Sequence, residues 1–121
     1  AAAVEARFPG TRVIAFGHLG DGNIHFNVRA PEGAGRGWVE GEGSDVTRFV
    51  HDIVTAAGGS ISAEHGIGQM KREELARLGG AARIAALRAI KQALDPKDIM
   101  NPGKLVPPIN SDGLAESGSP Q

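Results

Sequence analysis

Residues 12–29 read RVIAFGHLGDGNIHFNVR, and this stretch predicts a β-hairpin. Asp21-Gly22 is a strong hairpin-turn signal, and it lies between two segments rich in β-branched and aromatic residues. With these two residues at the centre of the turn, His18 lies directly opposite His25. Because side chains alternate along a strand, one face of the hairpin is then wholly apolar, which predicts that it covers a core. The other face carries His18, His25, Asn27 and Arg29.

The opposed histidine pair indicates a candidate metal site. Directly opposed residues of an antiparallel hairpin have Cβ atoms about 4.5–5.5 Å apart. The imidazoles of His18 and His25 can therefore converge on one divalent cation. A pair of exposed or hydrogen-bonded histidines explains the same pattern equally well. The hairpin by itself leaves both interpretations open.

A second polar pair, Glu64-His65, lies in the segment SISAEHGIG (residues 60–68), and residues 60–64 predict a short strand. In a regular strand these two side chains point to opposite faces, but the glycines that follow allow the strand to end or bulge, so that both enter one cleft. Glu64 then completes a His-His-Glu ligand set with an open coordination position, as in catalytic zinc sites. His65 is left as a nearby base, since histidine exchanges protons near neutral pH. The alternative is a polar loop in water.

Helical patterns account for much of the remaining chain. Apolar residues at helical spacing predict a helix over residues 44–57, with Ser44 as its N-cap. His51 lies on the polar side of this helix and is given no role. The other predicted helices are residues 1–8, 70–78 and 81–94. The last of them ends at Asp95-Pro96, because the residue before a proline avoids helical geometry.

Composition excludes several classes of function. The 121 residues include 13 Lys plus Arg and 14 Asp plus Glu, a formal charge of −1, which argues against nucleic-acid binding. The absence of cysteine excludes disulfides, thiolate zinc sites, Fe–S clusters and cysteine nucleophiles. No apolar run approaches the ~20 residues that span a bilayer. The chain begins at Ala1 without methionine, and we expect it to be a piece of a longer protein.

Three motifs, at residues 17–28, 58–68 and 95–104, occur in the order found in one known family. The chain resembles the C-terminal part of FAD-linked oxidases of the vanillyl-alcohol-oxidase type. The resemblance is greatest to the D-2-hydroxyacid dehydrogenase branch, which includes D-lactate dehydrogenase, D-2-hydroxyglutarate dehydrogenase and the FAD subunit of glycolate oxidase. It covers roughly residues 4–106.

The resemblance implies a role for each candidate residue. It implies a divalent metal, often zinc, held by His18, His25 and Glu64. It implies that His65 is both the catalytic base and a substrate contact, and that Asn27 also binds substrate. Asn101 is implied to lie near FAD.

The resemblance also implies the fold and the domain organisation. The expected class is α+β, with a ferredoxin-like antiparallel sheet and helices packed on one face. Residues 1–94 form a cap domain that binds substrate and metal, and residues 95–108 return toward the FAD domain. Residues 109–121 are expected to be a disordered tail because the chain loses its apolar periodicity there. FAD is bound mainly by an N-terminal domain that these residues do not include, so the chain by itself is expected to be inactive. The apolar residues Ile99, Met100, Leu105 and Val106 are then expected to lack the domain on which they pack.

The implied activity is oxidation of a D-2-hydroxy acid of the lactate, glycolate or 2-hydroxyglutarate type to the 2-oxo acid. The expected partners are this small molecule and an electron acceptor, either a flavoprotein, a quinone or oxygen. We expect a cytoplasmic enzyme, and the resemblance is compatible with a homodimer and with peripheral association of the full-length enzyme with the inner membrane. A non-catalytic metal-binding α+β module and a metal-dependent hydrolase remain alternatives with the same ligands. The motif at residues 101–104 favours the oxidase, since neither alternative gives a reason for it.

Overall fold

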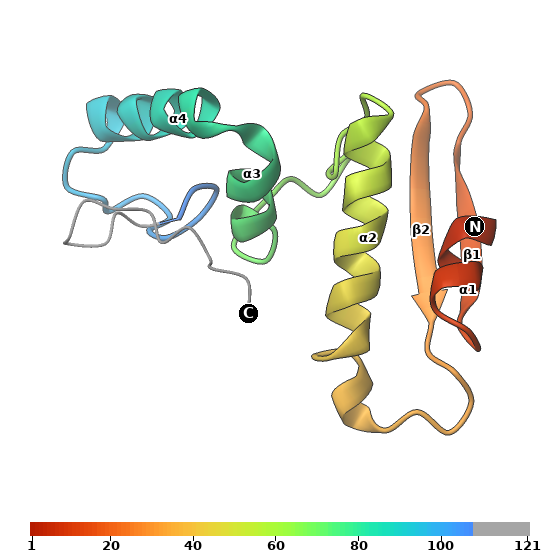
Figure 1. Cartoon of the computed structure of the whole chain (residues 1–121). Coiled ribbons are helices and arrows are strands. Elements are labelled where there is room, and N and C mark those ends of the chain that lie inside the picture. Colours follow the sequence, from red (N-terminus) through yellow and green to blue (C-terminus); the bar gives the residue numbers. More distant parts are fainter. Residues whose placement is uncertain (108–121) are drawn as a thin grey trace. The chain divides into compact units, whose positions relative to one another are not determined.

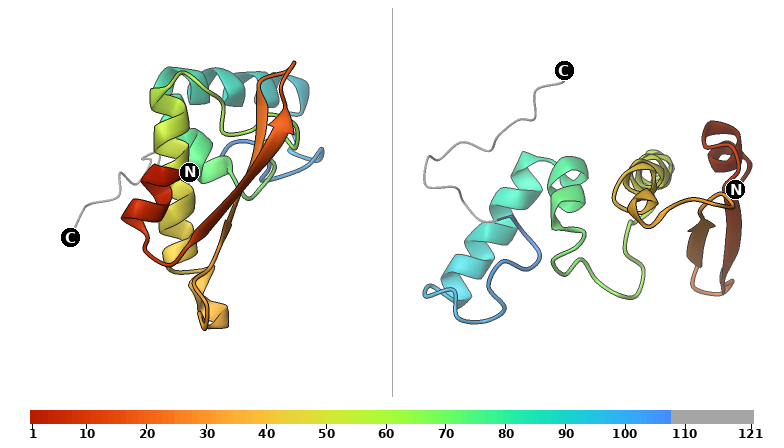
Figure 2. Two further views of the ribbon diagram at one scale, coloured as in Figure 1. Left: turned by 90° about the vertical axis from the view of Figure 1, so that its right-hand side faces the viewer. Right: turned by 90° about the horizontal axis from the view of Figure 1, so that it is seen from below.

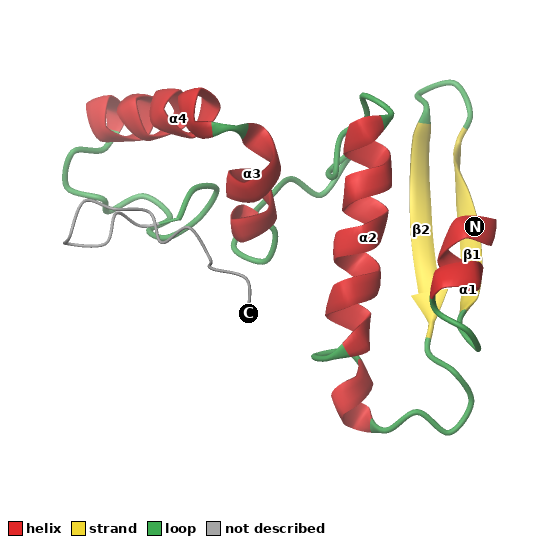
Figure 3. Cartoon of the chain, in the orientation of Figure 1, coloured by secondary structure: helices red, strands yellow, loops and turns green. Residues whose placement is uncertain are grey.

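The computed structural model describes residues 1–107, which belong to two compact units with a boundary after Gly66 (Figure 1). Unit 1 contains α1 (Ala2–Arg7), β1 (Arg12–His18), β2 (Asn23–Arg29), the 3-10 helix η1 (Arg36–Trp38) and α2 (Glu42–Ala56). Unit 2 contains α3 (Arg72–Gly79) and α4 (Ala81–Leu94). An antiparallel sheet combined with these helices confirms the α+β class (Figure 3). The predicted disordered tail, residues 109–121, lies outside the described residues.

The two strands form the predicted hairpin and lie side by side (Figures 1 and 2), but their register differs from the prediction by two residues. His18 pairs with Asn23, and His25 pairs with Phe16. The loop has four residues, 19–22, instead of two, and it contains a turn in which the Asp21 N–H donates to the carbonyl of His18 at 3.2 Å. Four-residue hairpin loops are commonly built around such a turn. The direct pairing of the two histidines was therefore wrong.

The small core of unit 1 lies where α1 meets both β1 and α2. Val4 of α1 and Val46 of α2 are buried. Phe8 and Phe49 pack edge to face, with ring centroids 5.7 Å apart, the arrangement that aromatic quadrupoles favour. Among the hairpin residues on the apolar face, Val13, Phe26 and Val28 are half-buried. This face therefore contributes to the core, as its apolar pattern predicts.

The helix predicted over residues 44–57 is confirmed as α2, with a different start. The helix begins at Glu42, its N-cap is Gly41, and no side chain caps it, so the prediction of Ser44 as the cap was wrong. Glu42 and Asp45 lie in the first turn, where carboxylates interact favourably with the helix dipole. No helix within residues 1–107 is long and apolar enough to cross a membrane.

The short strand predicted over residues 60–64 is wrong, and Figure 3 shows a loop there. Two serine hydroxyls make hydrogen bonds to backbone groups of this loop. The Ser60 hydroxyl accepts the Ser62 N–H at 3.2 Å, and the Ser62 hydroxyl donates to the carbonyl of Gly66 at 2.6 Å. Serine side chains compete with a β-ladder through such bonds. Glu64 and His65 are thus free of the alternation that a strand imposes.

Unit 2 consists of two helices joined at a sharp bend (Figure 2). The bend is at Gly80, whose φ of +72° lies in the left-handed region that glycine adopts without strain. Leu75 of α3 and Ile84 of α4 are buried where the two helices pack. The predicted end of the last helix is confirmed, since α4 ends at Leu94, directly before Asp95-Pro96.

The backbone of residues 95–107 is held by hydrogen bonds within unit 2. The buried carboxylate of Asp95 accepts the N–H groups of Ile99 and Met100 at 3.0 and 2.8 Å, and it pairs with the ammonium of Lys91. Further along, the Leu105 N–H donates to the carbonyl of Gly68 at 2.8 Å. Of the four side chains expected to lack a packing partner, Ile99, Met100 and Leu105 are exposed, whereas Val106 is half-buried. The segment therefore has a defined backbone but leaves these apolar groups uncovered.

Replacing Asp95 by asparagine is expected to lower the Tm of the chain and to speed amide exchange at Ile99 and Met100. The hydrogen bond from Lys91 is the main cause that holds the pKa of the Asp95 carboxyl below its ordinary value, and the same bond raises the pKa of Lys91. A lowered carboxyl pKa stabilises the fold above the ordinary pKa, and this stabilisation is lost as pH falls through the lowered value.

The Tm difference between the unsubstituted chain and Asp95→Asn should therefore be large at pH 7 and should shrink below about pH 4. Thermal unfolding followed by circular dichroism at pH 7 and at pH 3 measures it. Asp98→Asn is the matched control, because Asp98 lies 3.1 Å from the same ammonium but is 63% exposed. A Tm difference that is the same at both pH values would contradict this account.

Candidate metal centre

Three side chains from three segments of unit 1 converge on one point. His18 is the last residue of β1, His25 lies in the middle of β2, and Glu64 lies in the loop after α2. The Nε2 atom of His18 is 3.6 Å from Oε1 of Glu64, and Nε2 of His25 is 3.5 Å from Oε2. One nitrogen or oxygen from each residue lies within 4.8 Å of the other two. The structure thus brings together the three residues that the sequence offers as a ligand set.

The geometry of this cluster fits a divalent cation. Ligand atoms about 2.0–2.2 Å from a tetrahedral zinc ion are about 3.3–3.6 Å from one another. The separations of 3.6 Å from His18 to Oε1 and 3.5 Å from His25 to Oε2 are of this size, and each involves a different carboxylate oxygen of Glu64. Two imidazoles and one carboxylate are also the donor set that leaves one position open in catalytic zinc sites. The residues therefore fit the metal that the sequence predicts.

The cluster is open to solvent on one side. The side chain of His18 is 60% exposed, whereas those of His25 and Glu64 are 33% and 38% exposed. A buried structural zinc site is closed by its protein ligands. Partial exposure of all three donors instead leaves room for a small ligand next to a cation held by them.

The two residues with predicted roles beside the metal are also in unit 1. The His65 ring is 6.2 Å from the His25 ring, at an interplanar angle of 85°. Asn27 is exposed and follows His25 by two residues, so it lies on the same face of β2. The structure thus places both residues close to His25 in the fold, and their roles in substrate handling stay predictions.

Asn101 and His51, two residues considered in the sequence analysis, are not part of this cluster. Asn101 is an exposed residue of unit 2 with a φ of +49°, and its predicted contact with FAD stays a prediction. His51, which was given no role, lies in α2 and is not part of the His18–His25–Glu64 cluster.

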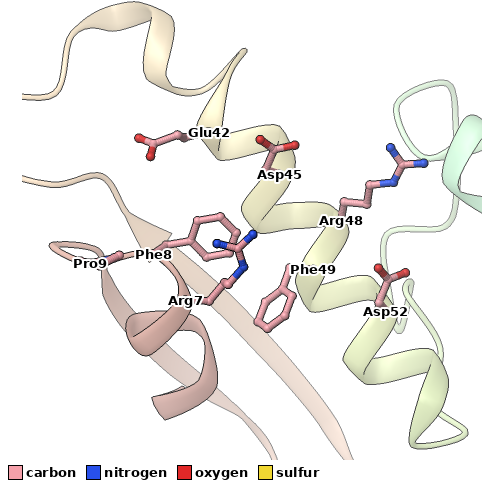
Figure 4. A pocket seen from close by; sticks show the side chains of 8 residues that line it. All are labelled: Arg7, Phe8, Pro9, Glu42, Asp45, Arg48, Phe49 and Asp52. Carbon is pink, nitrogen blue, oxygen red and sulfur yellow. The ribbon is translucent and has the colours of Figure 1, made fainter. Parts of the chain in front are cut away.

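A pocket of about 480 Å³ opens elsewhere in unit 1, between α1 and α2 (Figure 4). It contains none of the predicted site residues. Its lining mixes two arginines and three carboxylates with Phe8, Pro9 and Phe49. Figure 4 shows the charged groups spread along the helices without converging on one point. The metal centre is therefore the better candidate for the functional site.

Phe16 contacts the candidate ligand His25, and the sequence reasoning missed this contact. Its ring stacks on the imidazole of His25, with centroids 5.0 Å apart and planes inclined by 12°. Phe16 lies two residues before His18 in β1, so its side chain is on the histidine face of the hairpin and not on the apolar face. The sequence did offer a signal for this contact, because an aromatic residue stands at a position on the polar face of the hairpin. The incorrect register placed it opposite Asn27 instead of His25.

Comparison with known proteins agrees with the resemblance. Residues 1–105 match the family described as FAD linked oxidases, C-terminal domain. The chain is 39% identical over 104 residues to the D-2-hydroxyglutarate dehydrogenase of Stutzerimonas stutzeri (strain A1501), covering 86% of the chain and 22% of that protein. It is 40% identical over 97 residues to the mitochondrial D-2-hydroxyglutarate dehydrogenase of Arabidopsis thaliana, covering 78% and 16%. It is 39% identical over 97 residues to the D-lactate dehydrogenase of Archaeoglobus fulgidus, covering 80% and 20%.

The chain thus spans about a fifth of the length of these curated relatives. The family match covers most of the chain, and it includes the hairpin, the Glu64-His65 loop and the Asp95–Lys104 segment. The family that the three motifs predicted is confirmed. This chain belongs to the family of FAD linked oxidases, C-terminal domain.

Proposed function

We propose that this chain is the substrate- and metal-binding part of an FAD-dependent dehydrogenase that oxidises a D-2-hydroxy acid to the 2-oxo acid. The observation that carries the proposal is the convergence of His18, His25 and Glu64, with donor atoms within 4.8 Å of one another, in a chain of this oxidase family. The relatives named as D-2-hydroxyglutarate and D-lactate dehydrogenases support the substrate class.

In this proposal, His18, His25 and Glu64 bind a divalent cation and leave its solvent side to the substrate. When bound, such a cation supplies Lewis-acid stabilisation of negative charge on a hydroxyl oxygen and so lowers the pKa of that hydroxyl. His65 accepts the hydroxyl proton, and its ring is near that of His25. Asn27 orients the substrate by hydrogen bonding from the same face of β2. Each of these steps uses a side chain of unit 1.

We propose that this chain by itself does not hold FAD. Within residues 1–107, the connection from a strand to a helix is the long segment 30–41, whereas a dinucleotide pyrophosphate binds at a tight glycine-rich turn that begins a helix. We therefore place hydride acceptance, the chemistry that a flavin supplies, in a part of the enzyme outside this chain. Segment 95–108, with Asn101, is proposed to reach that part, and residues 1–94 are proposed as the cap.

Metal analysis of the purified chain tests the proposal. The unsubstituted chain is expected to bind about one equivalent of zinc, and His25→Ala and Glu64→Gln should each weaken binding by at least about a hundredfold. Loss of a residue that merely supports a ligand already costs about 10–100-fold. Dialysis against a zinc buffer followed by elemental analysis measures the affinities.

His51→Ala is the matched control, because it removes a histidine outside the cluster. Equal zinc content in the unsubstituted chain, His25→Ala and Glu64→Gln would refute the metal centre. The hydrolase and the non-catalytic module use the same donors, so a second assay separates them from the oxidase. Only the oxidase predicts that the full-length enzyme reduces a dye when a D-2-hydroxy acid is added.

A further inference from the structure

Phe16 makes an unusual contact for a residue on the solvent side of a hairpin. It pairs directly with His25 in the β1–β2 ladder, and its ring lies almost parallel to the imidazole, with centroids 5.0 Å apart and an angle of 12°. The residue is 59% exposed. Phe16 is thus largely outside the core of unit 1, and its ring contacts that of His25.

The contact with Phe16 can fix the orientation of the His25 imidazole. A metal-binding histidine usually donates its second ring N–H to a carboxylate or carbonyl, which fixes the orientation of the ring. The Nε2 atom of His25 faces Glu64 at 3.5 Å. The other contacts of the His25 ring are with the rings of Phe16, His18 and His65. Of these rings, Phe16 lies nearly parallel to the imidazole, so its contact can orient the plane of the ring.

Stacking supplies such a restraint. Two rings in a parallel, offset stack resist rotation of either ring about its Cβ–Cγ bond, because rotation breaks the contact. The edge of the imidazole, which carries Nε2, stays free because Phe16 covers only a face. A ligand ring that is already oriented loses less freedom when the metal binds, so its affinity is higher.

We propose that Phe16 is a positioning residue of the metal centre, whose ring holds the imidazole of His25 with Nε2 directed toward the cation. This inference rests on the proposed metal centre. It assigns to an aromatic side chain the orienting role that a hydrogen bond usually has in histidine-ligated sites.

Cobalt binding by the purified chain tests the proposal, since Co²⁺ in a zinc-like site has a visible spectrum that reports ligand geometry. We compare the unsubstituted chain with Phe16→Leu and Phe16→Val, which lack the ring, and with Phe16→Tyr, which retains it. Both aliphatic variants should bind Co²⁺ about tenfold more weakly, as expected for loss of a ligand-orienting group, and with an altered spectrum. Phe16→Tyr should restore both the affinity and the spectrum.

Ile14→Ala is the matched control for a general effect on the hairpin. Ile14 lies two residues earlier in β1, shares the face of Phe16, is 43% exposed and pairs with Asn27. Its substitution should leave cobalt affinity and spectrum unchanged. Circular dichroism and thermal unfolding of every variant report whether the hairpin is folded.

The outcomes are distinguishable. Unchanged affinity and spectrum in folded Phe16→Leu or Phe16→Val would overturn the positioning role while leaving the metal centre intact. An equal loss in Ile14→Ala, or failure of both aliphatic variants to fold, would mean that Phe16 acts through hairpin stability, which also overturns the proposal. Absence of cobalt binding by the unsubstituted chain would refute the metal centre itself, and this inference with it.

Discussion

Replacing His65 by asparagine in the full-length enzyme is expected to lower turnover by about 10²–10⁴-fold while leaving the metal content close to that of the unsubstituted enzyme. The reason is that His65 is proposed as the base, whereas other residues are proposed as the metal ligands. His65 lies beside His25 but is not one of the three convergent donors. Removal of a general base typically has an effect of about this size. Asparagine retains a polar side chain but cannot accept the proton.

The measurement combines steady-state kinetics on a D-2-hydroxy acid with elemental analysis of the same samples. The effect should fall mainly on kcat, because proton removal belongs to the chemical step. His51→Asn is the matched control and should change neither quantity. If His65→Asn loses its metal in parallel with its turnover, His65 is a ligand and the proposed division of roles is wrong.

Gly17→Ala is expected to destabilise unit 1 by about 3 kcal/mol, at the upper end of the usual cost of overpacking, and to abolish tight metal binding. A Cβ at Gly17 would lie 2.0 Å from the carbonyl oxygen of Asn23 and 2.9 Å from Cα of Ile24. Both are backbone atoms of the partner strand, so the strands must separate locally. His18 follows directly and pairs with Asn23, and its displacement would carry Nε2 away from Glu64.

Urea unfolding gives the change in stability, and a zinc titration of the same variant gives the change in affinity. Gly20→Ala is the matched control, because Gly20 lies in the loop of the same hairpin and a Cβ there meets no atom within 4 Å. It should leave both quantities unchanged. A Gly17→Ala chain with ordinary stability and zinc affinity would show that the strands tolerate the methyl group.

The hairpin illustrates how much of the site could be predicted from the sequence. Both strands and the identity of each face follow from the alternation of side chains. The register was wrong by two residues because Asp21-Gly22 is only half of a four-residue loop. A shift of two residues returns every side chain to the same face. His18 and His25 therefore remain neighbours, as a diagonal pair with ring centroids 6.1 Å apart.

Local chemistry limited the prediction elsewhere. The segment 60–64 alternates like a strand, but its serine hydroxyls bond to the backbone and no neighbouring strand pairs with it within residues 1–107. Glu64 was nonetheless identified, because its role was argued from ligand chemistry and not from strand geometry. Phe16 could not be assigned, since its partner depends on the register, and alternation alone fixes only the face.

The hydrogen-bonded segment 95–107 has a consequence for assembly. Lys91 and Asp95 already restrict the backbone that carries Ile99 and Met100, so a surface that covers these side chains does not have to order the chain first. Ordering one residue costs about 1–2 kcal/mol of conformational entropy, and a preformed segment avoids this cost on association. The free energy gained by burying its apolar side chains is then not reduced by this cost. A partner surface would therefore meet a segment whose backbone is already hydrogen-bonded.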